Sequence, residues 1–392
     1  MLEGSEDVSS QFTEMPKDKL LGGLLASGFD EGSCLSSGWG NRVLTLTSAF
    51  LYALLTNRVL LVDQGIVMTN LFCEPFPEKS WFLPVDFPLK ETFKILSQKF
   101  PHSYGNMLKK NILNTSTVSL PSYLYLHLAH DYDDHDKLFL CDQDQTLLSR
   151  VPWLIMKSDN YFVPSLFLMP SFEQELSKLF PQKDTVFHHL GRYLFHPSNH
   201  VWGLITRYYE AYLAKANERI GIQIRNFDTG PGPFQYVMDQ VLACTLKYKV
   251  LPQVDRKRTI VTQSEKANLK AILITSLSSG YFENVRNMYW EYPTVNGDVV
   301  EVFQPSQEQF QHTENSQGLG GLKPWILYKS NNQTTPNPPC RMAMSMEPCF
   351  HAPPFYDCKT KKGIDNGALV PHVRHCEDMS WGIKLVDNHD EL

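Results

Sequence analysis

The feature that most constrains the fold is the alternating segment 218–227, with the sequence ERIGIQIRNF. Isoleucine occupies the alternate positions 220, 222 and 224, which predicts a core strand with one apolar face. The opposite face carries Gly221, Gln223 and Arg225. A turn-rich stretch at 228–233 and apolar residues at helical spacing from Phe234 to Lys247 follow. This order is typical of an α/β half-domain, whose ligand site lies beyond the carboxyl end of the strand. An arginine there suits an anion, although an arginine on the exposed face of an edge strand gives the same pattern.

Composition describes a globular chain with room for two domains. The 392 residues are 42% hydrophobic and 20% charged. The net charge of −6 argues against a nucleic-acid binder, which needs a basic surface. No apolar run approaches the roughly 18 residues of a membrane span. Residues 1–10 are acidic and polar, unlike a signal peptide. We therefore expect neither a membrane anchor nor a secretory signal in this chain.

Cysteines and sequons point to an oxidising compartment instead. The disulfide candidates lie in a proline-rich C-terminal stretch and are Cys340, Cys349, Cys358 and Cys376. Zinc is the alternative, because His351, His372 and His375 are nearby, but a C-x-x-C pair is absent. Asn114 and Asn332 begin N-x-[ST] glycosylation motifs. Together these features favour a lumenal environment.

Hydrophobic patterns predict further elements on both sides of this strand. We expect no regular element in the first thirty residues, a helix over 43–56 and a strand over 58–63. Later segments predict helices over 172–180 and 188–216, and strands over 271–275 and 299–303. Among the inward positions of the 188–216 helix we count Trp202, Leu204 and Ile205.

Gly40, Asn41 and Arg42 open the first of these helices, where backbone N–H groups can bind an anion. The segment lacks a preceding strand and the third glycine of a dinucleotide fingerprint, so a glycine turn with Asn41 near the cap is equally compatible. Gly320 and Gly321 belong to a second glycine loop, GLGGLKPW, which contains a lysine.

Two acidic segments could carry chemistry. The run 130–136, HDYDDHD, can bind Mg²⁺ or Mn²⁺ through Asp131, Asp133 and Asp136, but a solvated acidic turn is the favoured interpretation because clustered carboxylates repel. Asp159 precedes an aromatic stretch, where burial would raise its pKa and suit a general base. An Asp-Asn turn explains the same residues.

Taken in order, several motifs resemble the plant xyloglucan-type α-1,2-fucosyltransferases. They are GNR at 40–42, LFCEPF at 71–76, HDYDDHD at 130–136, IGIQIR at 220–225, GGLKPW at 320–325 and RHCED at 374–378. The resemblance runs from about Lys17 nearly to the C-terminus. It implies an α/β fold, the variant GT-B class with two Rossmann-like halves facing a cleft. It also implies GDP-fucose as donor, a galactose of xyloglucan or arabinogalactan as acceptor, inversion, and no metal cofactor.

The resemblance also implies a cellular setting and an organisation of the chain. Family members are Golgi membrane proteins, so the protein would act on the lumenal side through an anchor absent from this chain, and a homodimer is possible. We expect an N-terminal extension (1–36), an acceptor-side α/β domain (37–215), a donor domain (216–335) and a Pro/Cys-rich segment packing back on the body (336–392).

Residue roles follow from the same resemblance. Arg225 would neutralise the charge on departing GDP, and Gly221 and Gln223 would shape the donor site beside it. The other donor-binding positions would be Gly40, Asn41, Arg42, Gly320 and Gly321. Asp159 would orient or deprotonate the acceptor hydroxyl.

The chain departs from the family pattern at two places. Ser36 and Ser37 directly join segments that relatives separate with a long insert containing a strand. A second piece, which contacts the nucleotide in the family, is missing between Gln311 and Gly318. A non-catalytic paralogue or a defective splice form that keeps the fold is therefore the alternative function.

Overall fold

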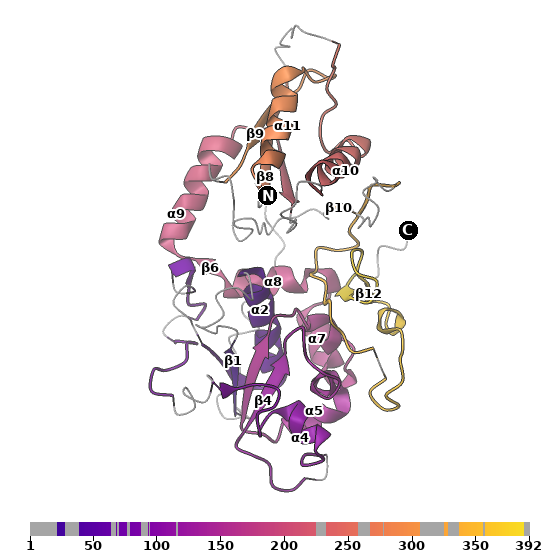
Figure 1. The fold of residues 1–392 in the computed structure, drawn as a ribbon. Coiled ribbons are helices and arrows are strands. Elements are labelled where there is room, and N and C mark those ends of the chain that lie inside the picture. Colours follow the sequence, from indigo (N-terminus) through magenta and orange to yellow (C-terminus); the bar gives the residue numbers. More distant parts are fainter. Residues whose placement is uncertain are drawn as a thin grey trace. The chain divides into compact units, whose positions relative to one another are not determined.

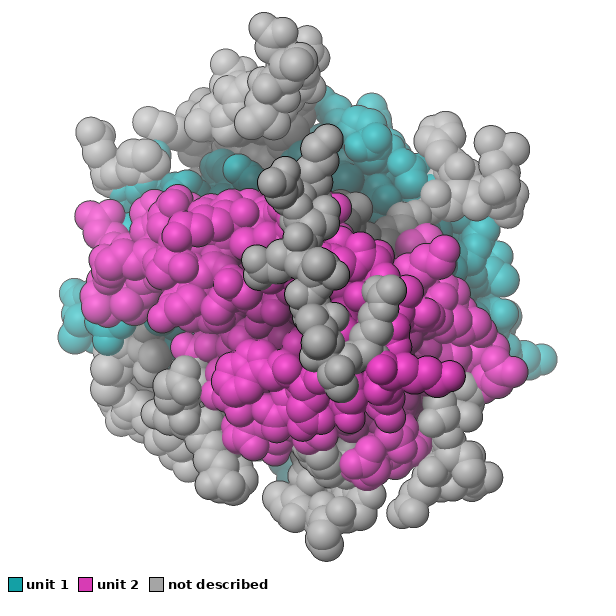
Figure 2. Space-filling model, turned by 90° about the horizontal axis from the view of Figure 1, so that it is seen from above, with its two compact units in different colours: residues 1–198, 344–392 teal, residues 199–343 magenta. Residues whose placement is uncertain are grey.

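The structure is a computed structural model that forms two compact units. It describes residues 22–27, 39–63, 68, 70–76, 79–87, 93, 95–114, 117–224, 233–257, 267–276, 278–305, 325–327, 337–355 and 357–387. Unit 1 comprises residues 1–198 and 344–392, and unit 2 comprises residues 199–343 (Figure 2). Each unit is built around its own parallel sheet.

Unit 1 contains a four-stranded parallel sheet with the strand order β2-β1-β5-β4. Figure 1 labels β1 and β4 of this sheet. The strands of unit 1 are β1 (Gly22–Ser27), β2 (Arg58–Val62), β3 (Phe72–Cys73), β4 (Tyr123–Leu128), β5 (Trp153–Ser158), β6 (His196–Pro197), β12 (Val373–His375) and β13 (Ile383–Leu385). Its α-helices are α2 (Trp39–Leu55), α4 (Tyr104–Lys109), α5 (Asp142–Leu148), α6 (Val163–Leu166), α7 (Glu173–Leu179) and α8 (Val186–Leu194).

Both faces of this sheet are buried. Leu124 and Leu126 of β4 pack into the large core of unit 1, together with Leu154 and Met156 of β5. The residues between them face the other way, where Tyr125 and Ile155 form a second cluster with Leu83. Coverage on both faces is the usual condition for a parallel sheet, and it explains the near-continuous apolar runs of β4 and β5.

Three expectations for unit 1 are wrong in detail. The first thirty residues do contain an element, β1, which lies between β2 and β5. Helix α2 begins at Trp39, four residues before the expected start, so Gly40, Asn41 and Arg42 lie in its first turn and not in a loop. The helix expected over 188–216 is interrupted at β6, where Pro197 has a fixed φ and no N–H.

Unit 2 contains a three-stranded parallel sheet with the order β7-β8-β9 (Figure 1). Its strands are β7 (Glu218–Ile224), β8 (Leu269–Ser276), β9 (Val299–Phe303), β10 (Trp325–Leu327) and β11 (Cys340–Met342). Its helices are α9 (Asn199–Tyr208), a π-helical turn (Tyr209–Leu213), α10 (Pro233–Lys247) and α11 (Gly280–Glu291). Trp202, Leu204 and Ile205, which we expected to face inward, are exposed on α9.

The predicted alternation of β7 is confirmed. Ile220 and Ile224 are buried in the core of unit 2, and Ile222 packs against that core. Gly221 and Gln223 are exposed. However, β7 is an edge strand of the sheet among the described residues, because β8 is its strand neighbour there. The edge-strand interpretation, which the sequence left open, therefore describes the position of β7 among these residues.

The predicted disulfides are confirmed, and all four candidate cysteines are oxidised. Cys349 pairs with Cys376, Cys358 with Cys141, and Cys340 with Cys244. The first two bonds lie within unit 1, and the third joins α10 to β11 within unit 2. Of the described helices, none is long and apolar enough to cross a membrane.

Candidate active site

The polar residues of unit 1 gather at the carboxyl ends of β4 and β5. These strands are parallel neighbours, so Leu128 at the end of β4 lies opposite Ser158 at the end of β5. The Ser158 hydroxyl and the Asn160 amide both donate to the Leu128 carbonyl oxygen, at 3.1 and 2.8 Å. Three buried groups thus fix the two loops that leave the sheet.

His130 and Asp159 meet across these two loops. The backbone N–H of His130 donates to Oδ1 of Asp159 at 2.8 Å, and Nδ1 of His130 contacts Oδ2 of the same carboxylate. The Asp159 side chain is 10% exposed, whereas that of His130 is 72% exposed. The hydrogen bond that the His130 ring donates to Asp159 raises the pKa of His130. A largely buried carboxylate therefore holds an accessible imidazole.

A second histidine–aspartate pair lies beside the first with the opposite exposure. Nε2 of His127 lies 2.8 Å from Oδ1 of Asp131, and here the histidine is 10% exposed and the carboxylate 62%. Nδ1 of His127 lies 2.9 Å from the Tyr125 hydroxyl. The hydrogen bond from His127 lowers the pKa of Asp131. Both ring nitrogens of His127 are engaged.

The acidic run does not converge on one point. Asp131 bonds to His127, and Lys137 lies 3.3 Å from the carboxylate of Asp134. Asp136 turns inward and is buried, and its Oδ2 accepts the backbone N–H of Asp133 at 3.2 Å. Burial raises the pKa of Asp136 to about 7. These carboxylates have separate partners, which supports the solvated turn for all of them except Asp136.

The donor-side residues expected in unit 1 lie on α2. Gly40, Asn41 and Arg42 occupy the first turn of this helix, where the backbone N–H groups have no intrahelical acceptor. The Arg42 guanidinium stacks over the Trp39 ring, 5.0 Å from its centroid. The structure therefore places these three residues at a helix N-terminus, as the anion-site interpretation requires.

The donor-side residues expected in unit 2 are partly described. Gly221 and Gln223 lie on the exposed face of β7, the first in the middle of the strand and the second directly before its last residue, Ile224. Arg225, Gly320, Gly321 and Asn332 lie outside the described residues. Asn114 is exposed, in a turn where the Thr117 hydroxyl accepts its backbone N–H at 2.9 Å. The structure thus brings Asp159 to His130, and keeps Gly221 and Gln223 together on another unit.

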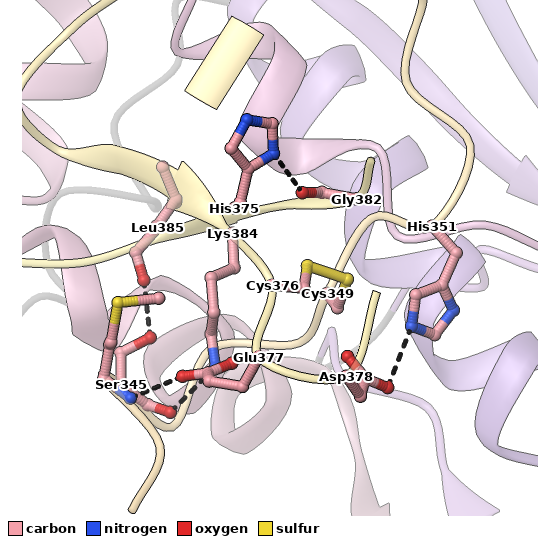
Figure 3. The surroundings of a disulfide bond; sticks show 11 residues. Ser345, Cys349, His351, His375, Cys376, Glu377, Asp378, Gly382, Lys384 and Leu385 are labelled. Carbon is pink, nitrogen blue, oxygen red and sulfur yellow. Dashed lines mark hydrogen bonds and ion pairs between the residues drawn. A yellow bond between two sulfur atoms is a disulfide. The ribbon is translucent and has the colours of Figure 1, made fainter. Parts of the chain in front are cut away.

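The C-terminal segment carries a further polar cluster around the Cys349–Cys376 disulfide (Figure 3). Ligand atoms of Cys349, His351 and Asp378 lie within 4.8 Å of one another, the distance range of a shared ion. The sulfur of Cys349 is bonded to Cys376, however, and a metal ligand must be a thiolate. The zinc alternative for these cysteines is therefore wrong in this disulfide-bonded state.

Glu347, in the same segment, was not singled out from the sequence. It is buried, and its carboxylate accepts the Tyr161 hydroxyl and the Phe187 backbone N–H, both at 2.7 Å. Phe187 lies in the first turn of α8, whose dipole favours an acidic group. Burial raises the pKa of Glu347 to about 8. This contact fastens the C-terminal segment to the body of unit 1.

His130 was likewise not assigned a role from the sequence. A usable signal existed, because His130 and Asp159 each follow an apolar strand segment. The carboxyl ends of parallel strands meet at one edge of a sheet, so residues that follow such strands are candidates for contact.

Comparisons with known proteins match these features. A sequence profile of the xyloglucan fucosyltransferase family covers residues 36–317 and 314–359. The chain belongs to the xyloglucan fucosyltransferase family. The galactoside 2-alpha-L-fucosyltransferases of Pisum sativum and Arabidopsis thaliana are 55% and 52% identical to it. These alignments cover 98% and 95% of this chain, and 85% and 84% of the two relatives.

A solved structure of the family has the same fold. An arginine-to-lysine mutant of Arabidopsis thaliana FUT1, in complex with GDP, superposes with a TM-score of 0.84 and 55% sequence identity. The match covers 97% of this chain and 86% of that one. The expected α/β fold with two Rossmann-like units, the variant GT-B class, is confirmed.

The comparisons also bear on the two departures from the family pattern. The two parts of the profile match meet at residues 314–317, inside the interval where we expect a missing piece. The alignment with the pea enzyme extends over 482 residues, although this chain has 392. The pea enzyme therefore contains internal segments that this family member lacks.

Proposed function

We propose that the chain transfers L-fucose from GDP-fucose to a galactose of xyloglucan or arabinogalactan, with inversion and without a metal. The observation that carries this proposal is the 55% identity, over 98% of the chain, to a galactoside 2-alpha-L-fucosyltransferase. The match to a structure of FUT1 in complex with GDP supports a guanine nucleotide donor. The disulfides agree with an oxidising compartment, and the Golgi lumen is part of the proposal.

In this proposal unit 2 binds the donor and unit 1 the acceptor. Gly221 and Gln223 leave the exposed face of β7 accessible for the diphosphate, and Arg225 follows directly at its end. A fixed guanidinium stabilises the charge that develops on departing GDP when no cation does so. The first turn of α2, in unit 1, presents N–H groups of its own that can bind an anion.

The test is a transfer assay with the purified chain, GDP-fucose, and xyloglucan or arabinogalactan oligosaccharides. We expect release of GDP together with a fucosylated product, at a rate unchanged by EDTA. Arg225→Ala should lower kcat about 10²–10³-fold, the effect of removing one charge-stabilising donor. Inhibition by EDTA would contradict the proposal that no metal is needed, but not the proposal that the chain transfers fucose.

Arg219→Ala is the matched control, because Arg219 lies near the amino end of β7, on the face that also carries Gly221 and Gln223. Its guanidinium donates to the carbonyl oxygens of Leu213 and Ala214, at 2.9 and 3.0 Å, and so has a local structural role. This variant should retain its rate. Absence of both GDP binding and transfer in the unmodified chain would support the non-catalytic alternative.

A further inference from the structure

Two histidine–aspartate pairs lie side by side at the carboxyl end of β4. In one pair the aspartate is exposed to solvent, and in the other the histidine is exposed. In the pair His127–Asp131 the imidazole is hidden and the carboxylate is exposed. In the pair His130–Asp159 the carboxylate is hidden and the imidazole is exposed. Only an exposed imidazole can meet a substrate, so the second pair is the candidate for chemistry.

The free ring nitrogen distinguishes the two histidines further. His127 uses both nitrogens, one toward Tyr125 and one toward Asp131. His130 uses Nδ1 toward Asp159, and none of the described residues bonds to its Nε2. An aspartate acceptor at Nδ1 favours the tautomer with the proton on that nitrogen, which leaves a lone pair on Nε2. This is the tautomer that a general base needs.

Asp159 also borders the place where an α/β sheet binds ligands, and His130 lies on the side away from β1. Asp159 directly follows β5, whose parallel neighbours are β1 and β4. The strand that follows β1 in the sequence, β2, lies on one side of β1. The later strands β4 and β5 lie on the other side. The boundary between β1 and β5 is therefore the point where the strand order changes, and ligands bind outside the carboxyl ends of the strands at such a point.

We propose that His130 is the general base that accepts the proton of the acceptor hydroxyl, and that Asp159 is a positioning residue that holds it. This inference rests on the proposed function and names a residue that the family resemblance does not assign. It reverses the expected roles, since Asp159 orients the base and does not itself take the proton.

The proposed step balances without a further reagent. The acceptor oxygen forms a bond to the anomeric carbon of fucose while the bond from that carbon to the diphosphate oxygen breaks. The electron pair of the broken bond stays on GDP, and the hydroxyl proton moves to Nε2 of His130. Asp159 stabilises the imidazolium that results, in the way a buried carboxylate does in a catalytic triad.

The charged groups around His130 fix the sign of the pH dependence. Asp159 raises the pKa of His130 through its hydrogen bond and its charge, and Asp131 adds a smaller effect of the same sign. A base must be unprotonated, so the transfer rate should rise with pH through the pKa of His130. The acid limb of the pH–rate profile is the range in which the rate rises with pH. Asp159→Asn removes the larger cause of the raised pKa of His130, so it should move this acid limb to lower pH.

The experiment compares His130→Asn with the unmodified chain in the transfer assay. The asparagine amide can replace the Nδ1–H donor toward Asp159 but offers no base at the position of Nε2. We expect kcat to fall about 10²–10⁴-fold and the acid limb to disappear, with GDP affinity and thermal unfolding unchanged. His130→Gln, whose amide reaches the Nε2 position, should lose the acid limb as well, which covers the case in which the asparagine variant does not fold.

His135→Asn is the matched control, because His135 belongs to the same acidic run and its ring lies 3.9 Å from the carboxylate of Asp133. It should retain the rate and the acid limb. A His130→Asn variant that keeps kcat within about threefold, with its acid limb intact, would overturn the inference while the transferase function stands. Absence of transfer in the unmodified chain would instead overturn the proposed function, and the inference with it.

Discussion

The two parallel sheets of this chain place polar residues at the same edge but support them differently. In unit 1 both faces of the sheet are buried, and Ser158 and Asn160 at its carboxyl edge are themselves buried and hydrogen-bonded. In unit 2 the edge strand β7 buries only its isoleucine face, and Gln223 is exposed. Buried residues at the carboxyl ends of the strands in unit 1 have a fixed side-chain geometry. The exposed face of β7 in unit 2 leaves room for a large ligand.

The two units also differ in the sequence separation of the contacts that stabilise them. Unit 1 is closed by its C-terminal segment through contacts that join distant residues: the Cys141–Cys358 disulfide spans 217 residues, and Tyr161–Glu347 spans 186. The disulfide of unit 2 spans 96 residues. Unit 1 therefore depends more on contacts that form only after most of the chain has been synthesised.

The strongest test of this dependence is Glu347→Ala. The substitution leaves the Tyr161 hydroxyl and the Phe187 N–H without their acceptor in a buried place, and each such loss costs about 1–3 kcal/mol. We expect the free energy of unfolding of unit 1 to fall by about 3–5 kcal/mol in urea denaturation. Glu347→Gln keeps the shape and a hydrogen-bonding group, and should cost about 1 kcal/mol at pH 7. A loss in Glu347→Gln as large as that in Glu347→Ala would show that the amide does not replace the carboxylate as acceptor, and that the shape of the side chain contributes little.

The disulfides give the next largest effect and separate the two units. Removing Cys141–Cys358 or Cys244–Cys340 by paired alanine substitutions should each cost about 2–4 kcal/mol. Hydrogen exchange should then increase in β4 and β5 for the first pair, and in β7 and β8 for the second. Cys73→Ala is the control, since Cys73 is exposed and unpaired among the described cysteines. Increased exchange in β8 after loss of Cys141–Cys358 would mean that the units unfold together.

The pH dependence of stability should also differ between variants of Glu347. Burial raises the folded-state pKa to about 8 from an ordinary value of 4.5, so the folded protein holds a proton that the unfolded chain releases between these values. This contribution to stability is complete below about pH 4.5 and is lost as the pH rises to about 8. The urea midpoint of the unmodified chain should therefore fall more between pH 6 and pH 8.5 than that of Glu347→Gln. Glu175→Gln, on an exposed position of α7, should retain the unmodified slope.

Elements with a strong local pattern could be predicted from the sequence. The strand expected at 220–225 is β7 at 218–224, and the strand expected at 299–303 matches β9. Strand β1 could not be predicted, because GGLLAS has two glycines and no alternation. Its strand conformation comes from pairing with β2 and β5, and such tertiary pairing overrides weak propensity.

The site was predictable only in part for a similar reason. Asp159 was identified by its aromatic surroundings, and His130 was visible in the acidic run. Their contact depends on β4 and β5 being neighbours, which the sequence of either segment alone does not specify. The partners of the C-terminal cysteines could not be predicted either. Cys141 and Cys244 lie far from them in the sequence, and disulfide connectivity does not follow from spacing.

The smallest expected effects on stability come from one substitution in each sheet, at or near the carboxyl end of a strand. Ser158→Ala at the end of β5 removes a buried donor to the Leu128 carbonyl oxygen and the acceptor of the Asn160 N–H, and should cost about 1–2 kcal/mol. Gln223→Ala near the end of β7 changes an exposed position and should alter stability by less than about 0.5 kcal/mol. If the exposed face of β7 binds the donor, the same variant should raise KM for GDP-fucose without lowering the unfolding midpoint. A stability loss in Gln223→Ala equal to that in Ser158→Ala would show that the face of β7 is a structural surface, because a ligand-facing side chain is not needed for folding.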